Sequence, residues 1–525
     1  MHILQVLSTS MLFFLFIFIL TIHVNSYISL FRPSMQSIRP NMQLEVSLSN
    51  LNSIAENLRN VGDNIEISSS DEIGIKNIVM KFGGSSLATP ERVVYVAKLI
   101  KEHVDRGYKP IIVCSAMGKT TNALLTAGDF ALEGSVSIEA LRTLHKNSMN
   151  ELGVSESCIE EVNDLLDDCE TLLSGIKYIG ELSPRTKDAL VSFGERMSVR
   201  IMAATLNNLG VPAQAFDSWR LGLKTTSEFG NADVLDESYS AIRSSLKKFE
   251  GFTVPIVTGF IGKDNNDKIT TLGRGGSDLT ATILGSSWPA DEVQVWKDVD
   301  GIMTADPRLV TTASPVTEVT YEEAAELAYF GAEVLHPISM QPAIRSNTPV
   351  RVKNSYNPSA IGTYIQSHRD KSNTLVTAIT SKSNVQLIDI VSTKMLGQHG
   401  FLSRVFEIFE AEGVSVDVVA TSEVSVSLTL DRSQVINRNI DKLILKLSEV
   451  ADVKQLDNRA IISLICNTDK ASEVLAKSFI VMQQLDMQVE MLSQGASKVN
   501  ISFVVDMKFK EALIKELHKT FFEST

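Results

Sequence analysis

The chain is poor in cysteine and has fewer basic than acidic residues. Its 525 residues include four cysteines, and no two of them stand at the C-x-x-C spacing of a zinc or redox motif. We therefore expect neither a structural zinc nor a disulfide framework, and we assign no metal ligands. Lys and Arg number 49 against 62 Asp and Glu, giving a net charge of −13. This balance argues against non-specific nucleic-acid binding and favours small molecules or proteins as partners.

Long apolar runs are also missing, except near the N-terminus. Residues 11–22 form one apolar run, which has the length of a signal-peptide core and is short for a membrane span. Small residues precede position 27, so residues 1–26 are predicted to be a signal peptide, with an uncleaved membrane anchor as the alternative. Once the leader is removed, we expect no association with a membrane.

Acidic residues are absent from residues 27–44, which contain Arg32 and Arg39 and are rich in Ser, Pro and Asn. This composition is typical of an organelle transit peptide. We predict a disordered, transit-like leader over residues 27–75. A signal peptide followed by such a stretch indicates a plastid bounded by extra membranes, and secretion is the alternative.

A P-loop is absent as well. Gly118-Lys119-Thr120 resembles the end of one, but the motif requires a glycine at the position that Val113 occupies. The chain is therefore not expected to be a P-loop NTPase. The hydroxyl-rich segment around Gly118 could still bind a small polar substrate.

What the sequence does contain is a strand, a glycine loop and a helix in succession. The apolar run 78–80 ends in Lys81, Gly83 and Gly84 follow, and a helical pattern with Pro90 in its first turn comes next. Backbone N–H groups of such a loop and the helix dipole favour an anion, and lysine adds a positive charge. The stretch predicts a phosphate site, with an ordinary tight turn as the alternative.

Strands alternate with helices over residues 75–354. The strands are expected at residues 78–81, 110–115, 253–258 and 292–297, and helices at residues 91–102 and 188–209. This alternation predicts an α/β fold with a mostly parallel sheet between helices, and ligands at the carboxyl ends of its strands.

Three further segments carry candidate site residues. Glu195 is expected to begin a helical stretch, either as a helix-end charge or as the partner of a substrate ammonium group. Residues 271–278 are expected to form a long loop, in which Arg274 suits a carboxylate or phosphate and Asp278 suits a nucleotide or water-bound Mg²⁺. A flexible surface loop is the alternative. Residues 297–308 carry both signs of charge, as nucleotide sites often do.

A weak internal repeat follows a predicted linker near Asn357. Two alternating strands at residues 414–419 and 424–431 recur at residues 487–492 and 499–506. Helices are expected before each pair, at residues 401–412 and 471–485, and after each pair, at residues 438–449 and 510–521. The pattern predicts two ferredoxin-like modules, which either bind a controlling ligand or serve only for dimerisation.

Taken together, these motifs resemble those of aspartate kinases, most closely the monofunctional, lysine-sensitive kind of plants and related lineages. The resemblance covers residues 76–525 and rests on the stretches 81–85, 192–195 and 273–278 and on the tail modules. It implies an amino-acid kinase domain over residues 76–365 and two ferredoxin-like ACT modules over residues 374–525. The first module would span residues 384–458, and the second residues 459–525 together with a strand at 374–381.

The resemblance implies phosphoryl transfer from MgATP to the β-carboxylate of L-aspartate, giving 4-phospho-L-aspartate for lysine, threonine, methionine and isoleucine synthesis. Lys81 and Asp278 would be catalytic. The ATP site would comprise Lys81, Phe82, Gly83, Gly84, Lys297, Asp298 and Arg308. The aspartate site would comprise Ala116, Thr121, Glu195, Arg274, Gly275, Gly276 and Ser277. No general base is needed, because an aspartate side chain with a pKa of ~3.9 is already ionised at neutral pH.

The resemblance also implies feedback control, with lysine as the expected effector and threonine or S-adenosylmethionine as alternatives. Asp417 would take the ε-ammonium group of lysine. The candidate contacts are Met395, Gln398, Gly400, Phe401, Leu402, Ser415, Val416 and Asp417. Pairing of ACT modules would give a homodimer or homotetramer.

Two positions depart from bacterial members of the family. Met303 and Glu333 stand where a tyrosine and a lysine are common near the nucleotide, so we assign no ATP contact to Glu333. The alternative functions are another amino-acid kinase, acting on glutamate or acetylglutamate, or a catalytically silent lysine sensor.

Overall fold

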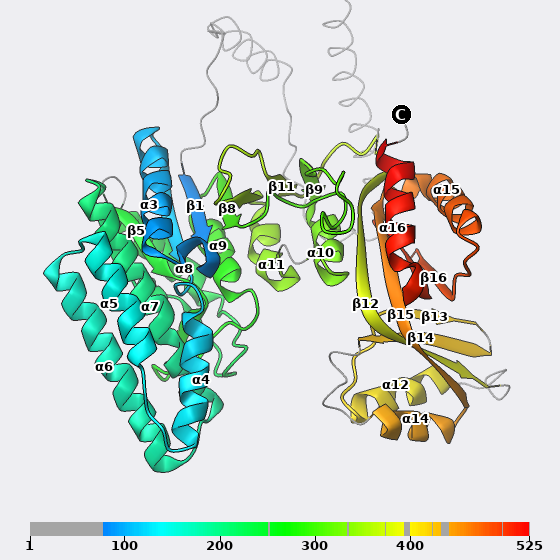
Figure 1. Cartoon of the computed structure of the whole chain (residues 1–525), viewed down its shortest axis with the longest axis horizontal. Coiled ribbons are helices and arrows are strands. Elements are labelled where there is room, and N and C mark those ends of the chain that lie inside the picture. The colour runs from blue at the N-terminus through cyan, green and yellow to red at the C-terminus, as the bar shows by residue number, and fades with distance from the viewer. Residues whose placement is uncertain are drawn as a thin grey trace, which may run out of the picture. The chain divides into compact units, whose positions relative to one another are not determined.

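The computed structural model describes residues 77–249, 253–332, 335–372, 374–392, 400–422, 424–431, 440–495 and 497–523. The predicted signal peptide and leader, together with Glu333, Met395 and Gln398, lie outside these ranges. Within them, residues 77–366 build an eight-stranded sheet and residues 376–506 build a six-stranded sheet (Figure 1).

The eight-stranded sheet has the order β3-β5-β2-β1-β8-β10-β11-β9, and every neighbouring pair is parallel except β10 and β11. Its central strands are apolar on both faces, as strands between two helical layers must be. The predicted α/β fold with a mostly parallel sheet is confirmed. The strands are β1 (Asn77–Phe82), β2 (Lys109–Cys114), β3 (Ala213–Phe216), β5 (Val254–Thr258), β8 (Glu292–Lys297), β9 (Glu318–Thr320), β10 (Val350–Asn354) and β11 (Thr363–Gln366).

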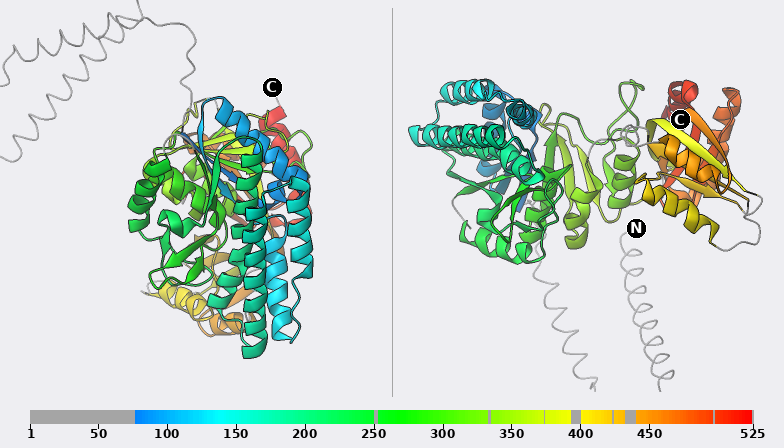
Figure 2. Two further views of the ribbon diagram at one scale, coloured as in Figure 1. Left: turned by 90° about the vertical axis from the view of Figure 1, so that its left-hand side faces the viewer. Right: turned by 90° about the horizontal axis from the view of Figure 1, so that it is seen from below.

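Helices cover both faces of this sheet (Figures 1 and 2). Ile78 and Met80 of β1 point into a core shared with α3 and α7, while Val79 points into a second core shared with α9 and α11. The helices are α3 (Pro90–Asp105), α4 (Thr120–Leu132), α5 (Glu139–Leu152), α6 (Glu156–Ile179), α7 (Pro184–Asn208), α8 (Glu237–Leu246), α9 (Gly276–Ser287), α10 (Tyr321–Tyr329) and α11 (Pro337–Ser346).

Two expectations about this domain are wrong. Glu195 does not begin a helix but lies in the middle of α7, whose N-cap is Ser183. Residues 271–278 are not one long loop, because β7 (Ile269–Thr271) ends there and α9 begins at Gly276. β7 belongs to a small sheet with β4 (Lys224–Thr225) and β6 (Ile261–Asp264).

The six-stranded sheet is continuous through both predicted modules. Its order is β13-β14-β12-β15-β17-β16, and β12 (Val376–Val391) pairs with β15 (Asp452–Cys466) along nearly the whole length of both strands. The register shifts between Lys382 and Val385, next to Asn384, which has a positive φ. The repeat therefore gives one shared sheet rather than two separate ones.

The shorter strands of this sheet begin later than expected. β13 (Val419–Thr421) and β14 (Ser425–Asp431) stand where strands at 414–419 and 424–431 were predicted, and β16 (Met491–Gln494) and β17 (Asn500–Asp506) replace 487–492 and 499–506. The helices are α12 (Phe401–Ala411), α14 (Ile440–Ser448), α15 (Ala471–Gln484) and α16 (Lys510–His518).

A buried ion pair fixes the segment between the two sheets. Arg369 forms a bidentate ion pair with Glu323 of α10, with nitrogen–oxygen distances of 2.6 and 2.8 Å. Arg369 also donates a hydrogen bond to the hydroxyl of Thr377 of β12. Glu323 is fully buried. The start of β12 is thus bound to the start of α10.

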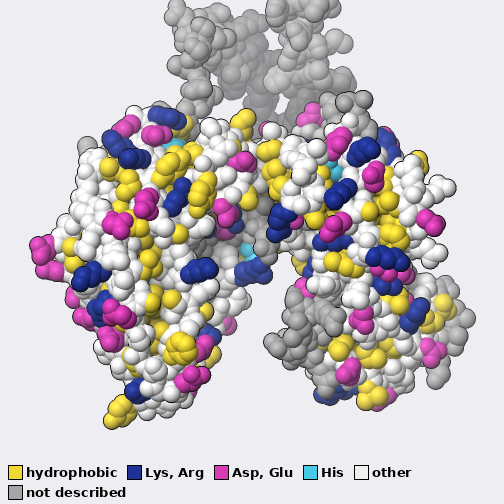
Figure 3. Space-filling model, in the orientation of Figure 1, with side chains coloured by type: hydrophobic (Ala, Val, Ile, Leu, Met, Phe, Trp, Pro, Cys, Tyr) yellow, Lys and Arg dark blue, Asp and Glu magenta, His cyan; other side chains and the backbone are white. Residues whose placement is uncertain are grey.

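The described helices include none that is both long enough and apolar enough to cross a membrane. Acidic and basic side chains are interspersed over the face drawn in Figure 3.

Candidate active site

Two lysines and one aspartate meet where β1 and β8 end. Lys81 Nζ lies 2.6 Å from Asp278 Oδ1, and Lys297 Nζ lies 3.4 Å from Asp278 Oδ2. Burial alone would raise the pKa of Asp278, but the ammonium groups of Lys81 and Lys297 outweigh it and hold this pKa below its usual range. Two positive charges against one negative charge leave this place suited to an anion.

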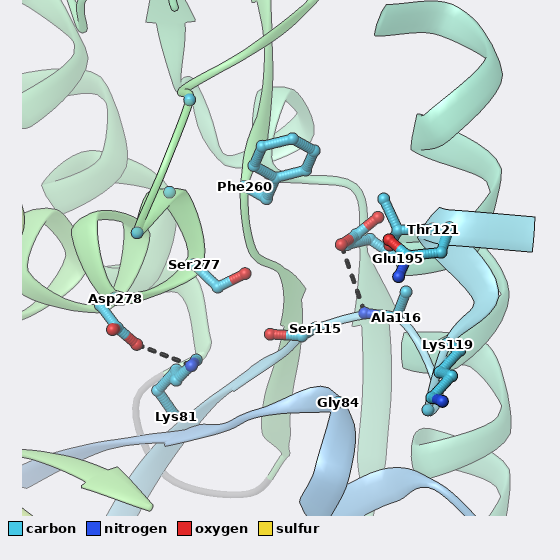
Figure 4. A pocket seen from close by; sticks show the side chains of 15 residues that line it. Lys81, Gly84, Ser115, Ala116, Lys119, Thr121, Glu195, Phe260, Ser277 and Asp278 are labelled. Atoms are coloured by element: carbon cyan, nitrogen blue, oxygen red, sulfur yellow. Dashed lines mark hydrogen bonds and ion pairs between the residues drawn. The ribbon is translucent and has the colours of Figure 1, made fainter. Parts of the chain in front are cut away.

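Glu195 lies on the opposite side of the same cavity, on α7 (Figure 4). Its Oε1 accepts a hydrogen bond of 3.3 Å from the backbone N–H of Ala116, and its Oε2 has no partner among the described residues. Burial raises the pKa of Glu195 to about 8, although the Ala116 bond opposes the shift. An unpaired buried carboxylate oxygen calls for a positively charged ligand group.

The cavity between these groups has a volume of about 360 Å³. Its predicted lining residues are Lys81, Gly84, Ala116, Thr121, Glu195, Gly275, Gly276, Ser277 and Asp278. The site predicted from the sequence therefore comes together around one space, from β1, the segment after β2, α7 and the N-terminus of α9.

Other lining residues were missed as site residues. They are Ser115, Gly118, Lys119, Asn122, Phe260 and Gly273. The signal was present, since most of them flank predicted residues on the hydroxyl-rich segment after β2 or on the glycine segment after β7. A spacing rule alone does not tell which members of a loop face inward.

Two glycines of the site have a structural reason to be glycine. Gly84 lies too close to neighbouring backbone for a side chain, and Gly275 has a backbone conformation that favours glycine. A Cβ on Gly84 would stand 2.9 Å from the carbonyl oxygens of both Ala116 and Gly118, so only glycine fits where the segments after β1 and β2 meet. Gly275 has a φ of 76° directly before α9, a conformation that glycine adopts without strain, and the first residues of α9, Gly276 to Asp278, line the cavity.

Phe82 was predicted to contact ATP, but its side chain is in the core. It is fully buried and stacks on Trp296, with ring centroids 5.8 Å apart. Its role is therefore packing of β1 against β8.

Several other predicted residues do not line the cavity. Arg274 is exposed between the lining residues Gly273 and Gly275, and Asp298 is exposed after β8. Arg308 pairs with Asp306, with Nη2 and Oδ2 2.8 Å apart.

The predicted effector residue Asp417 is already paired within the chain. Its Oδ2 lies 2.8 Å from Nζ of Lys382, and its Oδ1 accepts a 2.9 Å bond from the hydroxyl of Tyr329 on α10. Its side chain is 3% exposed. In this conformation the Asp417 carboxylate is occupied by Lys382 and Tyr329, and its role toward an effector ammonium stays a prediction. Of the other candidates, Gly400, Leu402 and Ser415 are exposed, Val416 is half-buried and Phe401 is buried.

Comparison with known proteins gives the family. The amino acid kinase family model matches residues 76–354, and the ACT domain model matches residues 388–437 and 467–521. Aspartokinase 1, chloroplastic, of Arabidopsis thaliana is 50% identical over 473 residues, covering 87% of this chain and 82% of that protein. The chain belongs to the aspartokinase family.

Solved structures of aspartokinases share the fold. E. coli aspartokinase III in complex with lysine and aspartate matches with a TM-score of 0.69 and 32% identity, covering 85% of this chain and 99% of that one. The complex of the same enzyme with aspartate and ADP matches with a TM-score of 0.69 and 33% identity, covering 85% and 100%. Both matches extend over the kinase domain and the ACT region of this aspartokinase-family chain.

Proposed function

We propose that the chain transfers the γ-phosphoryl group of ATP to the β-carboxylate of L-aspartate. One observation carries the proposal: a buried carboxylate with an unpaired oxygen, Glu195, faces a cationic phosphate site across a cavity of amino-acid size. Aspartate and ADP are bound in the related E. coli structures. Glu195 would hold the aspartate ammonium group and the exposed Arg274 its α-carboxylate, with Ala116 and Thr121 beside them.

The charged side chains indicate which end of the cavity would bind the phosphates of ATP. Lys81 and Lys297 would neutralise the transferring group, and Asp278 would fix the positions of both lysines. The N–H groups of Gly83, Gly84 and Ser277 would contact phosphate oxygens, and of these residues Gly84 and Ser277 line the cavity. Asp298 and Arg308 remain outer candidates for ATP.

A general base is unnecessary, because the attacking carboxylate is already ionised, as its pKa of ~3.9 implies. The chain's contribution is to bring two anions together and to stabilise a loose transition state. Mg²⁺ would come with ATP and supply further neutralisation of the phosphates. No group of three His, Cys, Asp or Glu side chains able to hold a metal occurs in the described part of the chain.

We further propose that lysine controls the activity by binding at the ACT region. The regulated pathway would be the synthesis of lysine, threonine, methionine and isoleucine. The support is the lysine bound in the E. coli relative. The assembly would be a homodimer or homotetramer through ACT modules. Plastid location is proposed from the leader composition and from the chloroplastic Arabidopsis relative.

The deciding experiment is an aspartate-dependent assay of ATP consumption on the chain without residues 1–75, titrated with lysine, threonine and S-adenosylmethionine. Glutamate and acetylglutamate serve as competing substrates. ATP consumption with either one but not with aspartate would indicate another amino-acid kinase. Lysine binding without any ATP consumption would indicate a silent sensor.

A further inference from the structure

The end of β10 and the turn that follows it, residues 354–357, were predicted to lead into a linker. In the structure, this turn contacts the two loops that leave β1 and β8. Both loops belong to the proposed phosphate site, since β1 ends next to Lys81 and β8 ends in Lys297. No residue of the turn lines the cavity.

The turn holds the loop after β1 by two hydrogen bonds from residues about 270 positions away. Ser355 Oγ lies 2.8 Å from Ser86 Oγ, and both side chains are fully buried. The hydroxyl of Tyr356 donates to the carbonyl oxygen of Ser85 at 3.1 Å. Ser85 and Ser86 belong to the short helix η2 (Gly84–Leu87) that begins at the cavity residue Gly84.

The same turn holds the loop after β8. The backbone N–H of Ser355 donates to the carbonyl oxygen of Lys297 at 2.8 Å. Asn354 and Asn357 both donate side-chain N–H groups to Asp300 Oδ1, at 2.9 and 3.2 Å.

Arg92 of α3 keeps the turn in place. Its Nη2 lies 3.0 Å from both the carbonyl oxygen and the hydroxyl of Ser355. Its guanidinium group stacks on the ring of Tyr356, 3.7 Å from the ring centroid. Ser355 is thus held from three directions, by α3, by η2 and by the end of β8.

We propose that Ser355 is a positioning residue for the nucleotide. It fixes the separation of the loops that leave β1 and β8, so that the ammonium groups of Lys81 and Lys297, which both pair with Asp278, meet the phosphates together. This inference rests on the proposed function, because it assigns the nucleotide to the Lys81 side of the cavity.

The test is a double-mutant cycle of Ser355→Ala and Ser86→Ala, with ADP and Mg²⁺ as the probe. We expect Ser355→Ala to raise the Kd for ADP, measured by calorimetry, about five- to tenfold, as loss of a buried hydrogen bond implies. The KM for ATP should rise in parallel, and the KM for aspartate should stay within about twofold. Adding Ser86→Ala to Ser355→Ala should raise the Kd for ADP little further, because both substitutions remove the same hydrogen bond.

A matched control is Ser463→Ala in the six-stranded sheet. Ser463 Oγ lies 2.7 Å from Ser502 Oγ in another buried serine pair, far from the cavity in the sequence and on a different sheet. Ser463→Ala should lower the melting temperature about as much as Ser355→Ala does, and it should leave the Kd for ADP unchanged.

The proposal is overturned if Ser355→Ala binds ADP as tightly as the parent chain. It is equally overturned if the KM for aspartate rises as much as that for ATP, which would mean a general loosening. If Ser355→Ala fails to fold, Tyr356→Phe takes its place, because it removes only the hydroxyl of an exposed residue. Tyr356→Phe should still raise the Kd for ADP about twofold or more. An unchanged Kd would then refute the proposal. Tight ADP binding without aspartate-dependent turnover would refute the proposed function and leave the ADP cycle valid.

Discussion

Raising the pH from 6.5 to 7.5 should tighten the binding of L-aspartate about eightfold, through the ionisation of Glu195. Only the ionised carboxylate can pair with the substrate ammonium group, and the pKa of Glu195 in the ligand-free protein is about 8. With that pKa, roughly 3% of the carboxyl is ionised at pH 6.5 and roughly 24% at pH 7.5, and the ratio sets the change in apparent affinity.

The assay is calorimetric titration of aspartate without nucleotide, in two buffers of different ionisation enthalpy. At pH 7.5, binding should release about 0.8 proton, the protonated fraction that must ionise. Two titratable neighbours are shifted away from the pH of this measurement. The ammonium groups of Lys81 and Lys297 hold the pKa of Asp278 below its usual range, and burial together with Arg274 lowers the pKa of His336.

Glu195→Gln should bind aspartate weakly and without this pH dependence. Glu181→Gln, at an exposed carboxyl just before α7, should behave like the parent chain. The ligand-free protein should also lose stability between pH 4.5 and about 8, because the folded state holds the Glu195 proton more tightly than the unfolded state does. A flat affinity in the parent chain, or an equal slope in Glu195→Gln, would refute the reasoning.

Four further substitutions test other parts of the structure. Lys81→Ala should lower kcat by ~10²–10³ while aspartate affinity, measured by calorimetry, is kept; a loss of only a few fold would contradict its role at the phosphoryl group. Gly84→Ala should raise the KM for ATP about tenfold or more, because overpacking against two carbonyl groups costs ~1–3 kcal/mol. Gly175→Ala, on an open face of α6, should instead add roughly 0.5–1 kcal/mol of stability in urea unfolding. Arg369→Ala should cost roughly 3–5 kcal/mol in the same measurement, because it removes the bidentate partner of the buried Glu323 charge and leaves only Lys371 Nζ, 3.6 Å from Glu323 Oε1; a cost under about 1 kcal/mol would contradict this.

The sequence predicts those parts of the site whose positions depend on a local pattern of residues. Lys81 and Lys297 end apolar strands, and parallel strands end at one edge of the sheet, so their meeting could be expected. The first turn of α9 was mistaken for loop because Gly275 and Gly276 are poor helix formers. Glu195 was misplaced for a similar reason, since the start of α7 depends on the Ser183 cap and not on the charge.

Pairings between distant residues could not be predicted. Asp417 looks available in the sequence, yet Lys382, 35 residues away, and Tyr329, 88 residues away, bond to its carboxylate. Ser355 lies in a segment with the composition of a linker, and its importance depends on which strands become neighbours of β10. Such contacts follow from strand order and register, which a single sequence does not specify.

The long strands β12 and β15 have a consequence for how the tail can be divided and assembled. A strand of 16 residues spans roughly 50 Å, so β12 serves as a common backbone for both ACT modules. The first module lacks its neighbour strand until the chain reaches β15, whose first half completes one module and whose second half completes the other. A chain cut after Asp431 is therefore expected to leave β12 with an open edge and to aggregate, rather than to yield a smaller folded sensor. Folding of the tail must likewise wait for residues near its end, which makes the two modules one cooperative unit.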